Sequence, residues 1–188
     1  MIKYFFVILF VSFVNFGNAQ SKLKHSAFYS SGIIVIKSVV VNNEGESYLG
    51  GYFSKTADFD TGDSLLNITS QQLNSSSYPD GFIVKLDEDG NFLWSKTLGK
   101  TESDLVVNLA LDDDENLYVT GYFKGTSEWD SLDFDFGVNE HYLKTKWNFR
   151  SAFILKLNPD GDFIWVKGIG YSDLAPENRF DVNPGKFI

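Results

Sequence analysis

Apolar residues recur at every second position in several short stretches of the chain. Within residues 82–86 the alternate positions hold Phe, Val and Leu, and the same period returns in residues 92–95 after the polar stretch Asp-Glu-Asp-Gly. A period of two places alternate side chains on opposite faces of a β-strand. The two stretches therefore predict a β-hairpin whose turn glycine, Gly90, suits a backbone with positive φ. No segment has convincing helical periodicity.

The predicted hairpin has a second copy further along the chain. Residues 81–96 (GFIVKLDEDGNFLWSK) and 152–167 (AFILKLNPDGDFIWVK) are identical at nine of 16 positions, where composition alone gives about one. Upstream, residues 39–53 and 109–123 match at an offset of 70 and predict another hairpin in each copy. The chain is therefore a tandem repeat of β-structure.

Each repeat contains at least four short strands in two hairpins, separated by a variable insert of some twenty residues. Tandem four-stranded sheets are typical of a β-propeller, in which each sheet, or blade, buries its broad faces against neighbouring sheets. We predict an all-β fold with two four-stranded antiparallel propeller-type blades, an incomplete or truncated β-propeller. The expected divisions are a signal peptide at 1–19, an N-terminal segment at 20–37, blade 1 at 38–104, blade 2 at 105–173 and the start of a truncated third repeat at 174–188.

The phrase GYFSKTADFD at residues 51–60 reappears as GYFKGTSEWD at residues 121–130. The glycine that opens each phrase is expected where strands bend or crowd. Trp94 and Trp165, at matching places in the last strand of each repeat, are expected to be buried in the core. We also expect the repeated aromatic residues to offer apolar surface between blades; at an offset of 70 the pairs are Tyr52 with Tyr122, Phe53 with Phe123, and Phe59 with Trp129.

Three stretches of the chain, GNFLWSKTLG, NLYVTGYFKGT and DGFIVKLDEDG, resemble the bacterial β-propeller repeat abbreviated SBBP. The resemblance covers residues 38–170, most of the chain. It implies an exported or surface-located repeat protein of Gram-negative bacteria. The SBBP repeat is defined by scaffold positions, so the resemblance brings no catalytic residues to carry over.

Residues 1–19 have the pattern of a secretory signal peptide. Lys3 precedes an apolar run, and the small residues Gly17 and Ala19 stand at the expected cleavage site. The run is shorter than the roughly 20 residues that cross a bilayer, so a membrane anchor is the less favoured alternative. We expect an exported protein that is secreted, periplasmic or located at the cell surface, with no membrane span after cleavage.

The acidic composition narrows the choice of partners. The chain has 16 Lys and Arg against 25 Asp and Glu, a formal net charge of −9. Such a charge argues against nucleic acid and against an anionic membrane surface as partners. Because the chain has no cysteine, disulfides and thiol chemistry are excluded and stability comes from packing. The expected partners are further blades, a second copy of the chain, or an unidentified protein or glycan.

The inserts, residues 61–79 and 131–149, hold the candidate binding residues. Tyr142, Trp147 and Phe149 are aromatic residues that can stack on sugar rings from a loop. Packing over the blade edge is the alternative role for these rings, and it is the one we favour.

The tripeptide Asp-Ser-Leu occurs at residues 63–65 in the first insert and at residues 130–132 where the second insert begins, and it is similar to an O-glycosylation motif of the same bacterial group. The similarity marks Ser64 and Ser131 as candidate acceptors.

Acidic residues give the chain its candidate chemistry. Asp87 and Asp89 alternate as at the start of a calcium-binding loop. Aspartates before a turn glycine also cap the turn through the backbone, and we favour this interpretation. Two further pairs of acids stand two residues apart after the repeated phrase, where a solvated strand end is the simpler explanation; they are Asp58 with Asp60 and Glu128 with Asp130.

Two hypotheses for the function follow. The first is a non-enzymatic exported repeat module that acts as a binding or display scaffold, a fragment of a longer surface or secreted protein, without a cofactor. The second is an exported hydrolase or lyase directed at glycans, with acidic residues at the blade ends as its catalytic groups. We favour the first because every repeated residue has a structural explanation, and we assign no catalytic or cofactor-binding residue.

Overall fold

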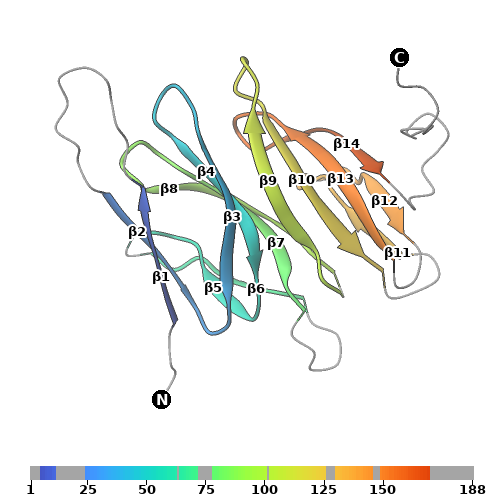
Figure 1. Ribbon diagram of the computed structural model, residues 1–188, viewed down its shortest axis with the longest axis horizontal. Helices are drawn as coiled ribbons and strands as arrows, with labels where there is room; N and C mark the ends of the chain where they lie inside the picture. Colours follow the sequence, from blue (N-terminus) through green and yellow to red (C-terminus); the bar gives the residue numbers. More distant parts are fainter. Residues whose placement is uncertain are drawn as a thin grey trace, which may run out of the picture.

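The computed structural model describes residues 5–11, 24–62, 64–71, 78–100, 102–125, 130–145 and 149–169. Fourteen strands and no helix lie in this part of the chain. The strands form three four-stranded sheets and one two-stranded sheet, and two of the four-stranded sheets stand side by side (Figure 1). The all-β prediction is confirmed, and none of the described sheets closes on itself.

Both four-stranded antiparallel blades predicted from the repeat are confirmed. Blade 1 pairs its strands in the order β3-β4-β7-β8, and these are β3 (Ile34–Val41), β4 (Ser47–Phe53), β7 (Asp80–Leu86) and β8 (Phe92–Leu98). Blade 2 has the same arrangement, with β9 (Leu105–Leu111), β10 (Leu117–Lys124), β13 (Arg150–Leu157) and β14 (Phe163–Ile169).

The tight turns within the blades are closed by the side chain of their first residue. In the turn after β7, Asp87 Oδ1 accepts hydrogen bonds from the backbone N–H groups of Asp89 and Asn91, both at 2.8 Å. Gly90 and its counterpart Gly161 have φ of 83° and 81°, a conformation that glycine adopts without strain. The positive φ expected of these glycines is confirmed.

A β-bulge interrupts the first hairpin of each blade. The bulged residue is Lys37 in β3 and Val107, at the equivalent position, in β9; neither has a partner in the strand register. The bulge brings the neighbouring strand so close that a Cβ atom on Gly51 would collide with the carbonyl oxygen of Val35, and Gly121 is crowded in the same way. The repeated glycines therefore stand where strands crowd, as expected.

The inserts form strands of their own, which the sequence pattern did not predict. In blade 1, β5 (Thr56–Asp58) pairs with β6 (Asn67–Thr69), and in blade 2, β11 (Asp130–Asp133) pairs with β12 (Tyr142–Thr145). Each insert hairpin brings a phenylalanine onto the sheet of its own blade.

The expected pairing of Phe59 with Trp129 was wrong, because the counterpart of Phe59 in blade 2 is Phe134. Phe59 contacts two phenylalanines of its own sheet with ring centroids 5.1 and 4.8 Å apart. In blade 2 the equivalent two rings are contacted by Phe134, at 5.6 and 4.8 Å. The structural match is therefore ADFDTG at 57–62 with LDFDFG at 132–137, an offset of 75. Blade 2 has five extra residues before this motif, so an alignment at an offset of 70 does not find the match. Trp129 lies outside the described residues.

The first aspartate of this motif closes the insert hairpin. Asp58 Oδ1 accepts hydrogen bonds from the backbone N–H groups of Asp60, at 3.1 Å, and Leu66, at 2.9 Å. Asp133 Oδ1 receives the two equivalent bonds at 3.0 and 2.8 Å. Asp58 is buried, so the expectation of a solvated strand end was wrong for this residue.

A further sheet, in the order β1-β2-β5-β6, covers the side of blade 1 that faces away from blade 2. It contains β1 (Phe5–Val11), inside the predicted signal peptide, and β2 (Lys24–Ser30). Phe28 of β2 is 2% exposed and contacts Phe59 at 5.5 Å between ring centroids. Leu98, seventy residues later, is buried in the same way against blade 2. β2 therefore covers blade 1 as β8 covers blade 2.

Trp94 and Trp165 hold equivalent places, as expected, but the expectation that they are fully buried was wrong. Both are half-buried. Each ring meets a tyrosine of the second strand edge-on, Tyr48 at 6.0 Å and Tyr118 at 5.9 Å between centroids. Trp94 lies on the face of blade 1 that is turned toward blade 2, and Trp165 holds the equivalent place on blade 2.

We predict that Phe134→Ala lowers the free energy of unfolding by about 3–5 kcal/mol, the usual cost of deleting a large core side chain. The ring is fully buried and fills the place that Phe59 fills in blade 1. Chemical denaturation provides the measurement. Val138→Ala, at a fully exposed residue of the same hairpin, is the control and should change stability by less than about 0.5 kcal/mol. A loss below about 1 kcal/mol for Phe134→Ala would contradict the assigned role.

Candidate functional site

Three aspartates gather at the end of the blades where the insert hairpins begin. Asp80 opens β7, Asp104 directly precedes β9, and Asp130 opens β11. The residues are 3%, 2% and 7% exposed, and the charges of Asp80 and Asp130 act on Asp104. Buried carboxylates are costly unless they are paired. The cluster is therefore the first place to look for chemistry.

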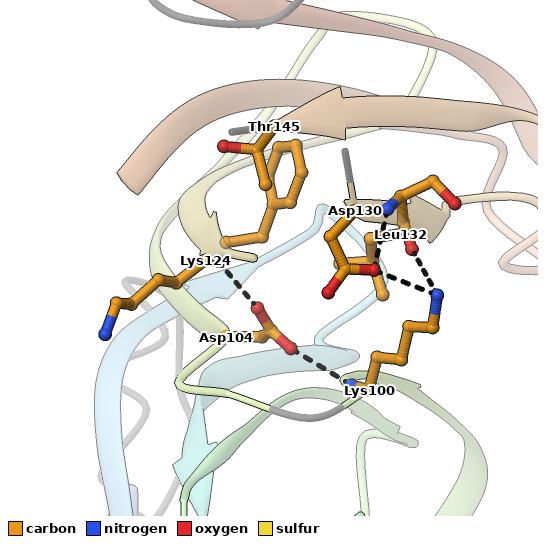
Figure 2. A pocket seen from close by; sticks show the side chains of 8 residues that line it. Lys100, Asp104, Lys124, Asp130, Leu132 and Thr145 are labelled. Atoms are coloured by element: carbon orange, nitrogen blue, oxygen red, sulfur yellow. Dashed lines mark hydrogen bonds and ion pairs between the residues drawn. The ribbon is translucent and has the colours of Figure 1, made fainter. Parts of the chain in front are cut away.

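Asp104 is held by backbone groups from two segments (Figure 2). Its Oδ2 accepts a hydrogen bond from the N–H of Lys100 and its Oδ1 one from the N–H of Lys124, each at 3.1 Å. The N–H of Asp104 donates to the carbonyl of Pro79 at 3.0 Å. This carboxyl fastens the connection between the blades to the end of β10.

Asp80 is less well satisfied. Its Oδ2 accepts a hydrogen bond of 2.7 Å from the N–H of Gln71, whereas Oδ1 is buried with no hydrogen-bond partner in the described structure. Gly99 packs so closely on this carboxyl that a Cβ atom there would collide with it. A buried acceptor without a partner costs about 1–3 kcal/mol, and a charged one costs more.

Burial raises the pKa of Asp80 to about 7 and that of Asp104 also to about 7, from an ordinary value of 3.8. The two backbone hydrogen bonds of Asp104 oppose the rise in its pKa, and the negative charges of Asp80 and Asp130 add to it. Both carboxyls therefore change protonation near neutral pH.

Two lysines border the cluster, and each forms an ion pair with an acidic residue. Lys100 Nζ lies 3.0 Å from Asp130 Oδ1, and Lys124 Nζ lies 3.1 Å from Glu102 Oε2. Lys100 also donates to the carbonyl of Ser131 at 3.2 Å. The bonds of Lys100 join the end of blade 1 to the insert hairpin of blade 2.

The space around the cluster limits what it can do chemically. The cavity lined by Asp104, Asp130 and the two lysines has a volume of about 10 Å3, which is room for about one water molecule. A sugar ring does not fit into this cavity. The arrangement instead suits a structural role with a pH response.

The acids that the sequence suggested are mostly not in this cluster. Asp130 belongs to it, Asp58 and Asp60 form the insert turn, and Glu128 lies outside the described residues. The calcium candidates Asp87 and Asp89 lie on the turn between β7 and β8.

No group of three or more acidic or histidine side chains in the described ranges is placed to hold a metal ion. Calcium binding at Asp87 and Asp89 stays a prediction.

The candidate binding residues of the second insert are partly exposed. Tyr142 on β12 and Phe149 just before β13 are 47% and 49% exposed, and Trp147 lies outside the described residues. Of the candidate glycosylation sites, Ser64 is exposed and Ser131 is half-buried on β11. The two rings offer apolar surface, Tyr142 on the insert hairpin and Phe149 beside β13.

Sequence reasoning missed Asp80 and Asp104. Asp80 stands in Pro-Asp-Gly and Asp104 in a polar connection after Thr-Glu-Ser, and both contexts are typical of solvated turns. Their position in the sequence was the available signal, because Asp80 opens and Asp104 directly precedes a strand that begins with buried residues.

The chain matches no family model. It is 27% identical over 121 residues, or 63% of its length, to the uncharacterized WD repeat-containing protein L264 of Acanthamoeba polyphaga mimivirus. The chain spans about 9% of the length of that protein. Together with the two stacked four-stranded sheets, this similarity indicates a repeat chain of the propeller type. The described residues contain no helix that is long and apolar enough to cross a membrane.

We predict that Asp80→Asn stabilises the protein at pH 8. The pKa of Asp80 is about 7 in the folded protein and near 4 in the unfolded chain. Protonation of Asp80 therefore favours the folded state, and this contribution to stability is complete below about pH 4 and is lost as the pH rises through 7. The amide of asparagine stays neutral at every pH. At pH 8 the free energy of unfolding of Asp80→Asn should therefore be about 1–2 kcal/mol higher than that of the parent, and the two should be equal at pH 4.

Thermal denaturation between pH 4 and 8 measures this difference. Asp113→Asn, at an exposed turn position, is the control for removing one negative charge. Equal effects of Asp80→Asn at pH 4 and pH 8 would show that folding does not raise the pKa of this carboxyl.

Proposed function

We propose that the chain is a repeat module of an exported β-propeller protein of the SBBP type and serves as a non-enzymatic scaffold for binding or display. The contact between the blades carries the proposal, because the residues that make it recur in both blades. The similarity to a WD repeat-containing protein supports the propeller assignment, and the signal-like pattern of residues 1–19 supports export.

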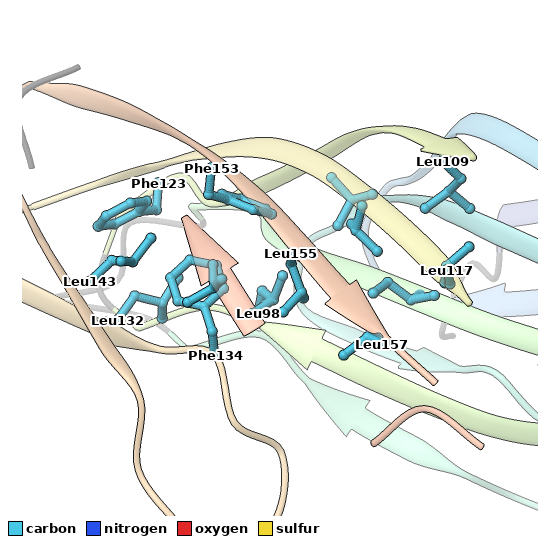
Figure 3. Close-up of a cluster of buried hydrophobic side chains, with 14 of the residues drawn as sticks. Leu98, Leu109, Leu117, Phe123, Leu132, Phe134, Leu143, Phe153, Leu155 and Leu157 are labelled. Carbon is cyan, nitrogen blue, oxygen red and sulfur yellow. The ribbon is translucent and has the colours of Figure 1, made fainter. Parts of the chain in front are cut away.

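The contact buries a continuous apolar layer (Figure 3). Tyr48, Ile83 and Leu98 of blade 1 meet the side of blade 2 that includes Val106 and Leu109, and all five are at most 4% exposed. Each large side chain that is fully buried contributes about 1.5–3 kcal/mol. The contact is therefore strong enough to fix one blade on the other.

A tight turn of blade 2 fits into the polar part of the contact. The carbonyl of Pro159 accepts hydrogen bonds from Trp94 Nε1 at 3.2 Å and from Lys85 Nζ at 3.3 Å. Gly161 of the same turn packs against the indole, where a Cβ atom would lie 3.1 Å from Trp94 Cε2. Lys85 is oriented by Glu46, 2.7 Å from its Nζ.

The outer face of blade 2 carries the same set of residues. Tyr118, Lys156 and Trp165 stand at the positions that receive the turn in blade 1, and Lys156 Nζ lies 4.8 Å from the centre of the Tyr118 ring. An acid again orients the lysine, here Asp112 at 2.9 Å. This second copy of the turn-receiving face supports stacking of a further unit of the repeat.

The alternative function is an exported hydrolase or lyase directed at glycans. Two neighbouring carboxyls with a pKa of about 7, Asp80 and Asp104, favour it, because acid–base catalysis needs groups that titrate near the working pH. The cavity of about 10 Å3 beside Asp104 argues against this function, because a sugar ring does not fit into it. We therefore place the scaffold function first.

We predict that the chain self-associates through the outer face of blade 2. Sedimentation velocity over a concentration series should show a mass that rises with concentration, and Trp165→Ala should weaken the association about tenfold, as expected for a central aromatic contact. Leu65→Ala, at a residue that is 77% exposed in the first insert, is the control and should leave the association unchanged. A monomer at all concentrations would count against the stacking role.

A panel of polysaccharides separates the two functions. The scaffold proposal expects no release of reducing ends from any member of the panel. Release that is abolished by Asp104→Asn, with the folded state verified by circular dichroism, would establish the hydrolase or lyase instead.

A further inference from the structure

At each of the two β-bulges, one residue has no partner on the neighbouring strand, and these two residues hold equivalent places in the blades. Lys37 of β3 and Val107 of β9 are 70 residues apart, and both line an open groove with a volume of about 440 Å3. The groove takes residues from both blades and lies where β4 and β10 end. It lies next to the buried aspartates, whose chain neighbours Pro79, Ser103 and Leu105 line it, and has a volume typical of small-ligand sites.

The repeated phrase Gly-Tyr-Phe supplies the walls of this groove. In each blade the glycine permits the bulge and the phenylalanine enters the core. The tyrosine between them, Tyr52 or Tyr122, is half-buried and lines the groove. The expectation that these tyrosines serve only the packing between blades is therefore incomplete.

Two cations lie on these rings. Lys37 Nζ is 5.8 Å from the centre of the Tyr52 ring, and Arg150 Cζ is 4.9 Å from the centre of the Tyr122 ring. Contact with a ring restricts the position of a cation, so less side-chain freedom is lost when it binds an anion.

Neither cation forms an ion pair with any residue that the structure describes. The remaining lining residues are Pro79, Ser103, Leu105 and Val106, so the groove is lined by no carboxylate from the described ranges. A chain of net charge −9 thus presents two unpaired cations and two tyrosines at one place. This charge pattern is complementary to an anionic ligand.

The backbone at the groove argues for a ring-shaped ligand over an extended peptide. Peptides that bind by strand addition need a free sheet edge. Beside the groove, β3 and β9 are edge strands that lie against each other, and blade 1 also covers β9 there: a Cβ atom on Gly81 would lie 3.1 Å from the backbone nitrogen of Val106. A ligand in the groove would therefore contact the tyrosines and the two cations. Tyrosine rings suit contact with sugar rings, and the cations suit carboxylates.

We propose that this groove is a binding site for an acidic oligosaccharide, with Lys37 and Arg150 binding carboxylates and Tyr52 and Tyr122 contacting the sugar rings. The proposal rests on the scaffold function proposed above and names its ligand class.

Isothermal titration calorimetry with trigalacturonic acid as the probe tests the site. The parent protein should bind it saturably and should not bind neutral maltotriose. Arg150→Met and Lys37→Met, which keep most of the side-chain stem, should each weaken binding about tenfold, the usual effect of losing one charge-assisted contact. Arg150→Lys should fall between the parent and Arg150→Met, because lysine keeps the charge without the planar fork.

Lys144→Met is the matched control, since Lys144 is an exposed lysine on β12 away from the groove. It should leave the affinity for trigalacturonic acid unchanged, and thermal denaturation should show that all variants fold. Equal binding of maltotriose, the same loss with Lys144→Met, or no saturable binding would each overturn the proposal. Tighter binding of a hexaglutamate peptide would also overturn it and would assign the groove to an acidic protein segment.

The sedimentation experiment is independent of this one, because Trp165 is not among the lining residues. Association through Trp165 without binding of trigalacturonic acid would reject only the groove. Binding of trigalacturonic acid by a chain that stays monomeric would reject only the stacking role.

Discussion

The apolar faces of each blade must be covered, and the rest of the structure follows from this requirement. The sheet of blade 1 is apolar on both sides, so it needs a layer on each. Its own insert hairpin and β2 supply one layer, and blade 2 supplies the other. A tight turn of blade 2 and the crowded glycines beside the bulges let these layers approach each other closely.

Much of the fold could be predicted from local patterns. Alternation in residues 82–86 and the glycine at 90 describe a hairpin whose geometry is determined within a few residues, and its second copy at 152–167 confirmed the unit. The insert strands could not be predicted in this way. The DFD turns that define them are offset by 75 residues rather than 70, and their short strands have little alternation to detect.

The candidate sites were harder to predict, because they are created by stacking. Asp80 opens β7 of blade 1 and Asp104 lies in the connection between the blades, so the two are buried together only in the folded arrangement. Lys37 and Arg150 are 113 residues apart in sequence, and each has an ordinary surface context. Only the tyrosine of Gly-Tyr-Phe carried a signal, since a half-buried ring repeated at the same place in both blades is not required by the core.

The place of β2 has a consequence for how such chains can be divided. β2 covers blade 1 as β8 covers blade 2. A closed core therefore consists of one blade and the last strand of the unit before it, whereas the sequence repeat consists of the four strands of one blade. A recombinant fragment cut at the sequence repeat, near residue 34, would lose Phe28 and expose the rings of Phe59 and Phe82 to water. A fragment that keeps the preceding last strand would retain a closed core, so modules should be exchanged at the start of that strand.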